Sequence, residues 1–296
     1  MEKNRRIQGL LAFREIGGLG RKRRRAIFEA MGADGDTTYF EMLIMALELR
    51  YLSPTMPIGD FTAAWEKANR IMKRCAAADI QIKTVFDPDF PEVLRFDDGP
   101  DLIYYRGNLK TLDNPNRAAV IGTRAPSKEG ADQARLWGRE LAEAGYTVVS
   151  GLAAGCDTAG HRGCLDAGGQ TVAFLPSSID QIVPRENAGL AQEIVNNGGC
   201  LISEYSPLET VSAYMFIERD RLQAQTSKFL LTSEFEDGSG TLHTLDDARK
   251  MGRTIHTTPE IAFRSAEGFR TATKSGIAYQ VTAAEDFPAL FEKLKG

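Results

Sequence analysis

The chain has 296 residues, of which 43% are hydrophobic and 26% charged, values typical of a globular protein with a packed core. No apolar run approaches the ~20 residues that a membrane-spanning helix needs, the start does not have the pattern of a signal peptide, and four cysteines are too few for a disulfide framework. The net charge of −4 does not by itself indicate a nucleic-acid binder. We therefore expect a cytoplasmic protein that is not bound to a membrane.

Basic residues are concentrated at the N-terminus despite the negative net charge. Nine of them precede residue 26, namely Lys3, Arg5, Arg6, Arg14, Arg21, Lys22, Arg23, Arg24 and Arg25. The glycine turn Ile16–Gly20 separates two apolar-periodic segments, as in a helix–hairpin–helix, whose turn amides and helix N-termini can hold a phosphate. Plain helix connectors show the same pattern, so a DNA contact and a solvated helix face are both open.

The first 79 residues are predicted to form a small domain made only of helices. Apolar-rich segments over 39–51 and 61–78 predict two more helices, with Pro54 and Pro57 between them. The pattern changes to that of strands near Ile80. We therefore expect a helix–hairpin–helix or SAM-like domain over residues 1–79 and a second domain over residues 80–296.

From Ile80 onward, short strands alternate with helices. The predicted strands cover 80–85, 102–107, 118–121, 147–150, 171–175, 200–203 and 229–232, and the predicted helices cover 129–143, 158–167, 190–197 and 242–251. This alternation predicts an α/β fold, an extended Rossmann-like, doubly wound and mainly parallel sheet with helices on both faces. Such folds bind ligands beyond the carboxyl ends of the strands.

Three glycine-containing loops follow predicted strands at the place where such a site would lie. Their candidate residues are Gly122, Thr123 and Arg124 in the first loop, Ser150, Gly151, Gly155 and Asp157 in the second, and Gly238, Ser239, Gly240 and Thr241 in the third. Glycine permits close backbone approach to a ligand, arginine offers a planar cation for phosphate, and helix N-termini attract anions. Together the loops predict an anion-binding crevice.

Motifs for several other chemistries are missing from the sequence. There is no P-loop, no dinucleotide-binding glycine fingerprint with its acidic partner, and no nucleophile elbow. Cys156, His161 and Cys164 lie close together, but no second pair of ligands follows to complete a structural zinc site. His161 comes one helical turn after Asp157, where capping or packing is expected. We predict no cofactor, no metal and no catalytic residue.

Several stretches, taken in order, resemble the DprA/Smf family of DNA-processing proteins. They are Phe90–Leu94, Pro100–Asn108, Ile121–Arg124, Ser150–Gly163, Gly169–Ala173, Val183–Asn187, Leu201–Tyr205, Gly238–Thr241 and Ala284–Phe287. The match runs from about Ile80 to Leu294, and an ordered set of this many motifs is specific.

The resemblance implies a Rossmann-like domain that binds single-stranded DNA in a basic pocket, often dimerises, and helps to load the RecA recombinase during recombination or natural transformation, without enzymatic activity. Carried over residue by residue, Gly122, Thr123 and Arg124 would hold phosphate, and the second loop would shape another wall of the pocket. Arg219 and Arg221 match the two arginines of the family's Arg-Asn-Arg segment.

Three features depart from the family pattern. Glu218-Arg219-Asp220-Arg221 stands where the family has a basic residue followed by Arg-Asn-Arg, and acids beside a phosphate pocket oppose DNA binding unless they pair with the arginines. The stretch Leu222–Ser227 lacks the family's apolar, glycine-containing sequence. We also expect no winged-helix tail after Phe287.

Two other hypotheses stay open. One is a non-catalytic nucleotide sensor, for example in defence against foreign DNA, because acidic substitutions suit a ribose hydroxyl better than a phosphate chain. A nucleoside-phosphate hydrolase is disfavoured, because Thr244 stands where related hydrolases have their catalytic glutamate. The other is an interaction protein whose partner surface the sequence does not locate.

Overall fold

The computed structural model describes residues 2–31, 39–53, 55 and 57–295. Its first described part is helical, with α1 (Glu2–Arg14), α2 (Arg21–Ala30), α3 (Tyr39–Glu48) and α4 (Ile58–Ala77). The exposed glycines of the 15–20 turn join α1 to α2, while Ile16 and Leu19 of the same turn are buried. Pro54, which we expected to separate two helices, lies outside the described residues, as does the side chain of Lys3.

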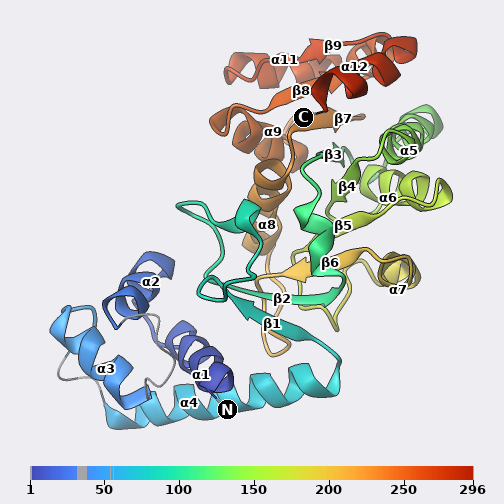
Figure 1. Cartoon of the computed structure of the whole chain (residues 1–296). Coiled ribbons are helices and arrows are strands. Elements are labelled where there is room, and N and C mark those ends of the chain that lie inside the picture. The colour runs from blue at the N-terminus through green and yellow to red at the C-terminus, as the bar shows by residue number, and fades with distance from the viewer. Residues whose placement is uncertain (1, 32–38, 54, 56, 296) are drawn as a thin grey trace.

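The described residues from 81 onward include nine strands that form one sheet (Figure 1). The strands are β1 (Gln81–Thr84), β2 (Leu102–Gly107), β3 (Arg117–Ile121), β4 (Thr147–Ser150), β5 (Thr171–Leu175), β6 (Cys200–Ser203), β7 (Phe229–Thr232), β8 (Thr254–Thr257) and β9 (Gln280–Val281). The intervening helices are α5 (Lys128–Glu143), α6 (Cys156–Asp166), α7 (Ala188–Asn196), α8 (Ala213–Thr226), α9 (Thr241–Lys250), α10 (Pro259–Arg264), α11 (Ala266–Lys274) and α12 (Phe287–Leu294), with short 3-10 turns at 92–94, 109–113, 185–187 and 284–286.

The strand order is β1-β2-β6-β5-β4-β3-β7-β8-β9. Strand β2 is antiparallel to both β1 and β6, and every other pairing is parallel. The prediction of a mainly parallel Rossmann-like sheet is thus confirmed. The central strands are buried along their whole length because helices cover both faces, as their uninterrupted apolar runs predict.

Helices α5 and α6 pack unusually close together on one face of the sheet, because glycines lie at their contact. A Cβ atom added to Gly138 would lie 2.1 Å from the carbonyl oxygen of Gly160, and one added to Gly163 would lie 1.9 Å from that of Arg135. Both contacts are with backbone atoms, which no side-chain rotation can relieve. A side chain at either position would therefore push the two helices apart.

Gly163→Ala is accordingly expected to lower the free energy of unfolding by about 1–3 kcal/mol, the usual cost of overpacking a core. A matched control is Gly189→Ala near the start of α7, where nothing lies within 4 Å of the added Cβ atom; there alanine is the better helix former. Urea denaturation of both variants checks the expectation. Equal stability of the two would show that α5 and α6 separate at no cost.

The N-terminal helices share a hydrophobic core with one side of the sheet. Leu10 and Phe13 of α1 and Ile71 of α4 belong to the same buried cluster as Tyr104 of β2 and Leu175 of β5. This apolar cluster includes residues on both sides of the predicted division of the chain at residues 79 and 80. The division itself stays a prediction.

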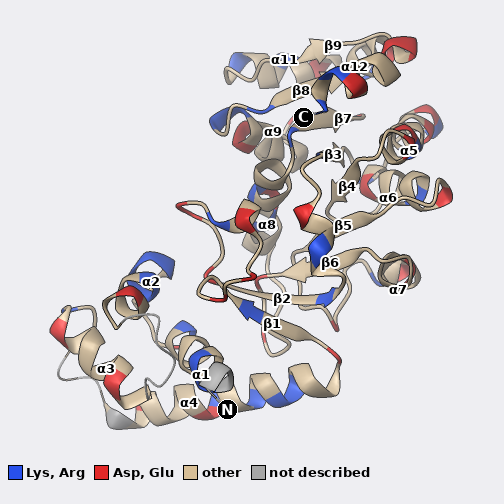
Figure 2. Cartoon of the chain, viewed as in Figure 1, with Lys and Arg blue, Asp and Glu red and all other residues tan. Residues whose placement is uncertain are grey.

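Most of the N-terminal arginines with described side chains form ion pairs or hydrogen bonds with other parts of the protein. Figure 2 shows Lys and Arg concentrated on α2. Arg24 forms a 2.5 Å ion pair with the fully buried Asp101, which Arg14 approaches at 3.4 Å. Arg25 donates to the carbonyl oxygens of Gly99 and Pro100. Neither of the two possibilities left open for this cluster, a DNA contact or a solvated helix face, describes these three arginines, which hold the helices against the second part of the chain.

Within the residues that the structure describes, no helix combines the length and the apolar composition required to cross a membrane.

Candidate nucleic-acid interface

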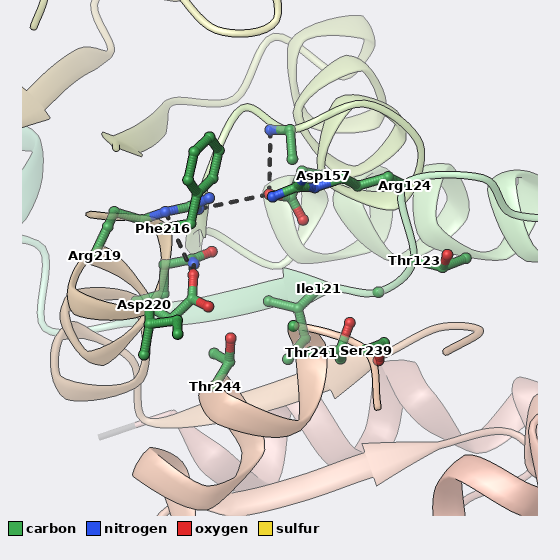
Figure 3. A pocket seen from close by; sticks show the side chains of 15 residues that line it. Ile121, Thr123, Arg124, Asp157, Phe216, Arg219, Asp220, Ser239, Thr241 and Thr244 are labelled. Carbon is green, nitrogen blue, oxygen red and sulfur yellow. Dashed lines mark hydrogen bonds and ion pairs between the residues drawn. The ribbon is translucent and has the colours of Figure 1, made fainter. Parts of the chain in front are cut away.

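A cavity of about 300 Å³ lies where the connections of the sheet change direction (Figure 3). From β3 the chain builds β4, β5 and β6 on one side, and then returns to build β7, β8 and β9 on the other. The loops that leave the adjacent strands β3 and β7 therefore diverge, and this opening is where doubly wound sheets bind ligands.

The cavity brings together eight of the predicted site residues, from all three loops and from α8. They are Gly122, Thr123, Arg124, Asp157, Arg219, Ser239, Gly240 and Thr241. The other lining residues are Ile121, Ala153, Phe216, Ile217, Asp220, Gln223 and Thr244.

The first and third loops are tied together by Glu234, which follows β7. Its carbonyl oxygen accepts a hydrogen bond from the amide of Thr123 at 2.6 Å. Its carboxylate accepts from the amide and the hydroxyl of Ser127, at 2.7 and 2.6 Å. These bonds hold the loop that carries Arg124 at a fixed place beside the end of β7.

Arg124 is the exposed cation at the mouth of the cavity. Its guanidinium carbon lies 4.8 Å from the centre of the Phe216 ring, a cation–π contact. Among the described residues it forms no ion pair, so its charge is available to an incoming anion. An aromatic face beside an unpaired arginine is a surface on which a base and a phosphate could be held together.

In the second loop only Asp157 among the predicted residues borders the cavity. Its carboxylate accepts from the amides of Gly151 and Ala153, at 3.1 and 3.3 Å, and burial raises the pKa of this carboxyl although Arg219 lies nearby. Ser150 is fully buried and donates to the carbonyl oxygen of Val120. These contacts fix the loop and leave Ser150 out of reach of a ligand.

Gly151 and Gly155 are required by close packing. A Cβ atom on Gly151 would lie 1.1 Å from Nη1 of Arg219, so any larger residue displaces that guanidinium. Gly155 has φ +76° and its added Cβ would lie 2.4 Å from the carbonyl oxygen of Thr123, a conformation and a contact that only glycine accepts without strain. These two glycines, like Gly238 of the third loop, do not line the cavity.

One face of α8 forms the buried side of the cavity. Phe216, Arg219, Asp220 and Gln223 follow the i, i+3, i+4, i+7 spacing of a single helix face. Arg219 is 4% exposed, and its guanidinium lies 3.7 Å from the carboxylate of Asp157 and 3.4 Å from that of Asp220. The sequence pattern contained this spacing, but we did not predict α8 as a helix.

The acidic residues of the Glu218–Arg221 segment are paired with arginines. Such pairing is what makes acids beside a phosphate pocket compatible with DNA binding. Asp220 lies against Arg219, and Glu218 forms a 2.8 Å ion pair with Arg21 of α2. Burial, with Asp157 adding to it, raises the pKa of Asp220 to about 6. Asp220 is therefore ionised at neutral pH, and its ionisation lowers the stability of the folded protein.

Arg221, which matches the second arginine of the family's Arg-Asn-Arg segment, does not line the cavity. Its guanidinium makes hydrogen bonds of 2.7 and 3.0 Å with the carboxylate of Glu204 and lies 3.5 Å from that of Asp98. Residues two apart on a helix point in nearly opposite directions, so Arg219 and Arg221 cannot reach the same site.

His161 has a packing role. Its ring Nδ1 is 2.6 Å from the hydroxyl of Thr171, and burial lowers its pKa to about 3. In the part of the chain that the structure describes, no group of three or more His, Cys, Asp or Glu side chains is placed to hold a metal ion.

Comparisons with known proteins agree with these features. A family model described as DNA recombination-mediator protein A matches residues 81–292. DNA processing protein DprA of Streptococcus pneumoniae is 34% identical over 211 residues, which are 71% of this chain and 73% of that protein. Protein Smf of Escherichia coli is 35% identical over 198 residues, 66% of this chain but only 52% of Smf, so the match spans about half the length of that relative.

Solved structures give the same result. The crystal structure of DprA from Streptococcus pneumoniae has a TM-score of 0.75 at 26% identity and covers 97% of both chains. A structure of DNA processing protein A from Helicobacter pylori, described for its single-stranded DNA binding mode, has a TM-score of 0.64 at 28% identity and covers 72% of this chain and 96% of that one. This chain therefore belongs to the DprA/Smf family of DNA-processing proteins.

Proposed function

We propose that the chain binds single-stranded DNA, with the phosphate backbone held at the mouth of the cavity at the carboxyl ends of β3 and β7. The observation that carries the proposal is Arg124, an exposed cation that has no ion-pair partner among the described residues and lies over the Phe216 ring between two glycine-containing loops. Thr123 and the Ser239–Thr241 loop at the start of α9 supply hydroxyls and a helix N-terminus, which favour a phosphate.

The other predicted residues act indirectly in this proposal. Gly122 permits close approach of the β3 loop, because a Cβ there would meet the Cys156 side chain at 2.6 Å. Ser150, Gly151, Gly155 and Gly238 shape the loops, and Asp157 holds Arg219 in the buried side of the cavity. Arg221 holds α8 in place from its other face.

The test is fluorescence anisotropy of a labelled oligo-dT at two salt concentrations. Arg124→Ala is expected to weaken binding about 10-fold or more, because a hydrogen bond to a charged group is worth ~1.5–3 kcal/mol, and to lower the salt dependence by about one phosphate contact. The control is Arg139→Ala, an exposed arginine on α5 that pairs with Glu143 of its own helix. Equal affinity of wild type, Arg124→Ala and Arg139→Ala would remove the cavity from the proposal.

The resemblance extends the proposal to the protein's setting. We propose a cytoplasmic protein without catalytic activity that acts in recombination or natural transformation, as a homodimer and with RecA as a partner. Sedimentation of the purified chain and a pull-down with RecA test the last two points. The nucleotide-sensor alternative is not favoured, because the named relatives are DNA-processing proteins.

A further inference from the structure

A second opening lies where α4, α7 and the loop after β5 meet. It consists of two adjoining cavities of about 770 and 250 Å³, which share Asp180, Ile182 and Ala188 in their walls. We call this opening the α7 groove. None of the described residues that line it also lines the cavity at the ends of β3 and β7, so the two sites can be occupied independently.

The floor of the α7 groove is aliphatic. Ile182, Val183 and Val195 are half-buried there, and Ile179 and Leu201 of the same lining are almost fully buried. No described residue of the lining is aromatic, whereas proteins that bind single-stranded nucleic acid stack its bases on aromatic side chains. The floor is therefore suited to aliphatic side chains of a protein and not to bases.

Three arginines from three different elements lie around this floor. Arg74 of α4 forms a 2.9 Å ion pair with Asp180. Arg106 of β2, which donates to carbonyl oxygens at the end of α4, and Arg185 of the 185–187 turn form no ion pair among the described residues. Three guanidinium groups and one carboxylate give the lining a net charge of +2, in a chain whose net charge is −4. The rim therefore attracts carboxylates.

The helix beside the groove adds to this positive charge. Figure 2 shows Lys and Arg on the half of α4 that leads to β1. Arg70 and Lys73 of this half are exposed, as is Arg74 of the groove itself. An acidic partner would therefore meet positive charge beyond the rim as well as at it, which favours its encounter with the groove.

We propose that the α7 groove binds an acidic segment of a partner protein in an extended conformation, with aliphatic side chains on the floor and carboxylates at the rim. Successive side chains of an extended segment point to opposite sides, so alternating acidic and aliphatic residues suit both parts of the groove. Arg74 and Arg185 are exposed, which leaves the groove open at its rim, whereas sites for small molecules enclose most of their ligand.

The test is fluorescence anisotropy of a labelled peptide in which the pair Glu-Leu is repeated. Two control peptides of the same length repeat Lys-Leu and Glu-Ser. We expect the Glu-Leu peptide to bind wild type about tenfold more tightly than either control, because only it combines carboxylates with aliphatic side chains. Unlabelled oligo-dT should not displace it, since the groove and the DNA cavity share no lining residue.

Two variants test the rim and the floor separately. Arg185→Glu is expected to weaken binding of the Glu-Leu peptide about tenfold, because an attraction becomes a repulsion. Arg139→Glu, the same change at an exposed arginine of α5, should leave the affinity unaltered. Ile182→Ser removes an aliphatic side chain without changing the charge and should weaken binding about fivefold. Thermal unfolding of each variant shows whether it is folded.

Failure of the Glu-Leu peptide to bind, or equal binding of the three peptides, would overturn the proposal. So would a loss of peptide binding in Arg124→Ala but not in Arg185→Glu, because the peptide would then lie in the cavity at the ends of β3 and β7. If Arg185→Glu weakens binding of oligo-dT and not of the peptide, the groove is a nucleic-acid surface instead. Oligo-dT binding by wild type reports on the proposed function separately.

Discussion

Asp101→Ala is expected to lower the free energy of unfolding by about 3–5 kcal/mol, the usual result of removing one partner from a buried ion pair. Asp101 is fully buried and lies between Arg24, at 2.5 Å, and Arg14, at 3.4 Å. Without its carboxylate, two largely buried guanidinium groups from α1 and α2 lose their counter-ion. The same change also removes the contact that joins these helices to the start of β2.

The stability difference between wild type and Asp101→Ala should also depend on pH. Burial by itself would raise the pKa of this carboxyl, but Arg14 and Arg24 hold it below its ordinary value. A carboxyl with a lowered folded-state pKa contributes stability above its unfolded pKa, about 3.9, and loses it as pH falls through the lower folded value. The difference between wild type and Asp101→Ala should therefore be full at pH 7 and shrink in acid.

Urea denaturation at pH 7 and at acid pH measures both effects. The control is Asp132→Ala, which removes an exposed carboxylate paired with Lys128 at 3.8 Å on α5 and should change stability by less than about 1 kcal/mol. A loss below 1 kcal/mol for Asp101→Ala as well would mean that the N-terminal helices are held by their apolar core alone.

Asp220→Asn should have the opposite effect and stabilise the protein, by about 3 kcal/mol at pH 7.5. Burial raises the pKa of Asp220 from 3.8 to about 6, and each tenfold shift in a protonation equilibrium corresponds to about 1.4 kcal/mol. A carboxyl whose folded-state pKa is raised destabilises the folded protein when ionised, so wild type loses stability as pH rises from 4 through 6. Asparagine keeps the shape and does not ionise.

Thermal unfolding of wild type and Asp220→Asn across pH 4 to 8 is the measurement. The variant should unfold at higher temperature at pH 7.5, and the two curves should meet near pH 4. A constant difference at all pH values would show that Asp220 acts through packing and not through its charge. A charge kept at such a cost in a cavity wall is typical of residues that serve binding.

The strands were predictable because a strand that is buried on both faces is a short, mostly apolar run in the sequence. Segments 102–107, 147–150, 171–175 and 229–232 have the bounds that the apolar runs predict. Helix α8 was not predicted, because from Arg219 onward its buried positions include Arg, Asp, Gln and Thr side chains. These residues face polar partners, so the helix has no apolar stripe to detect.

The place of the site in the fold was predictable, because the direction of the parallel strands alone decides it. The loops after β3 and β7 had to meet, because the carboxyl ends of parallel strands lie at one edge of the sheet. The role of each arginine was not predictable in this way. Arg221 meets Glu204, and Arg21 meets Glu218 from almost two hundred residues away, and no local pattern reports such long-range pairs.

The apolar cluster that α1 and α4 share with β2 and β5 affects how the protein can be divided. A fragment that starts at residue 80 would expose Tyr104 and Leu175 to water and leave Asp101 without its cations. It would also free Glu218 on α8 from Arg21 and so add an unpaired negative charge close to the cavity. Expression studies and crystal screens of residues 80–296 should therefore retain the N-terminal helices.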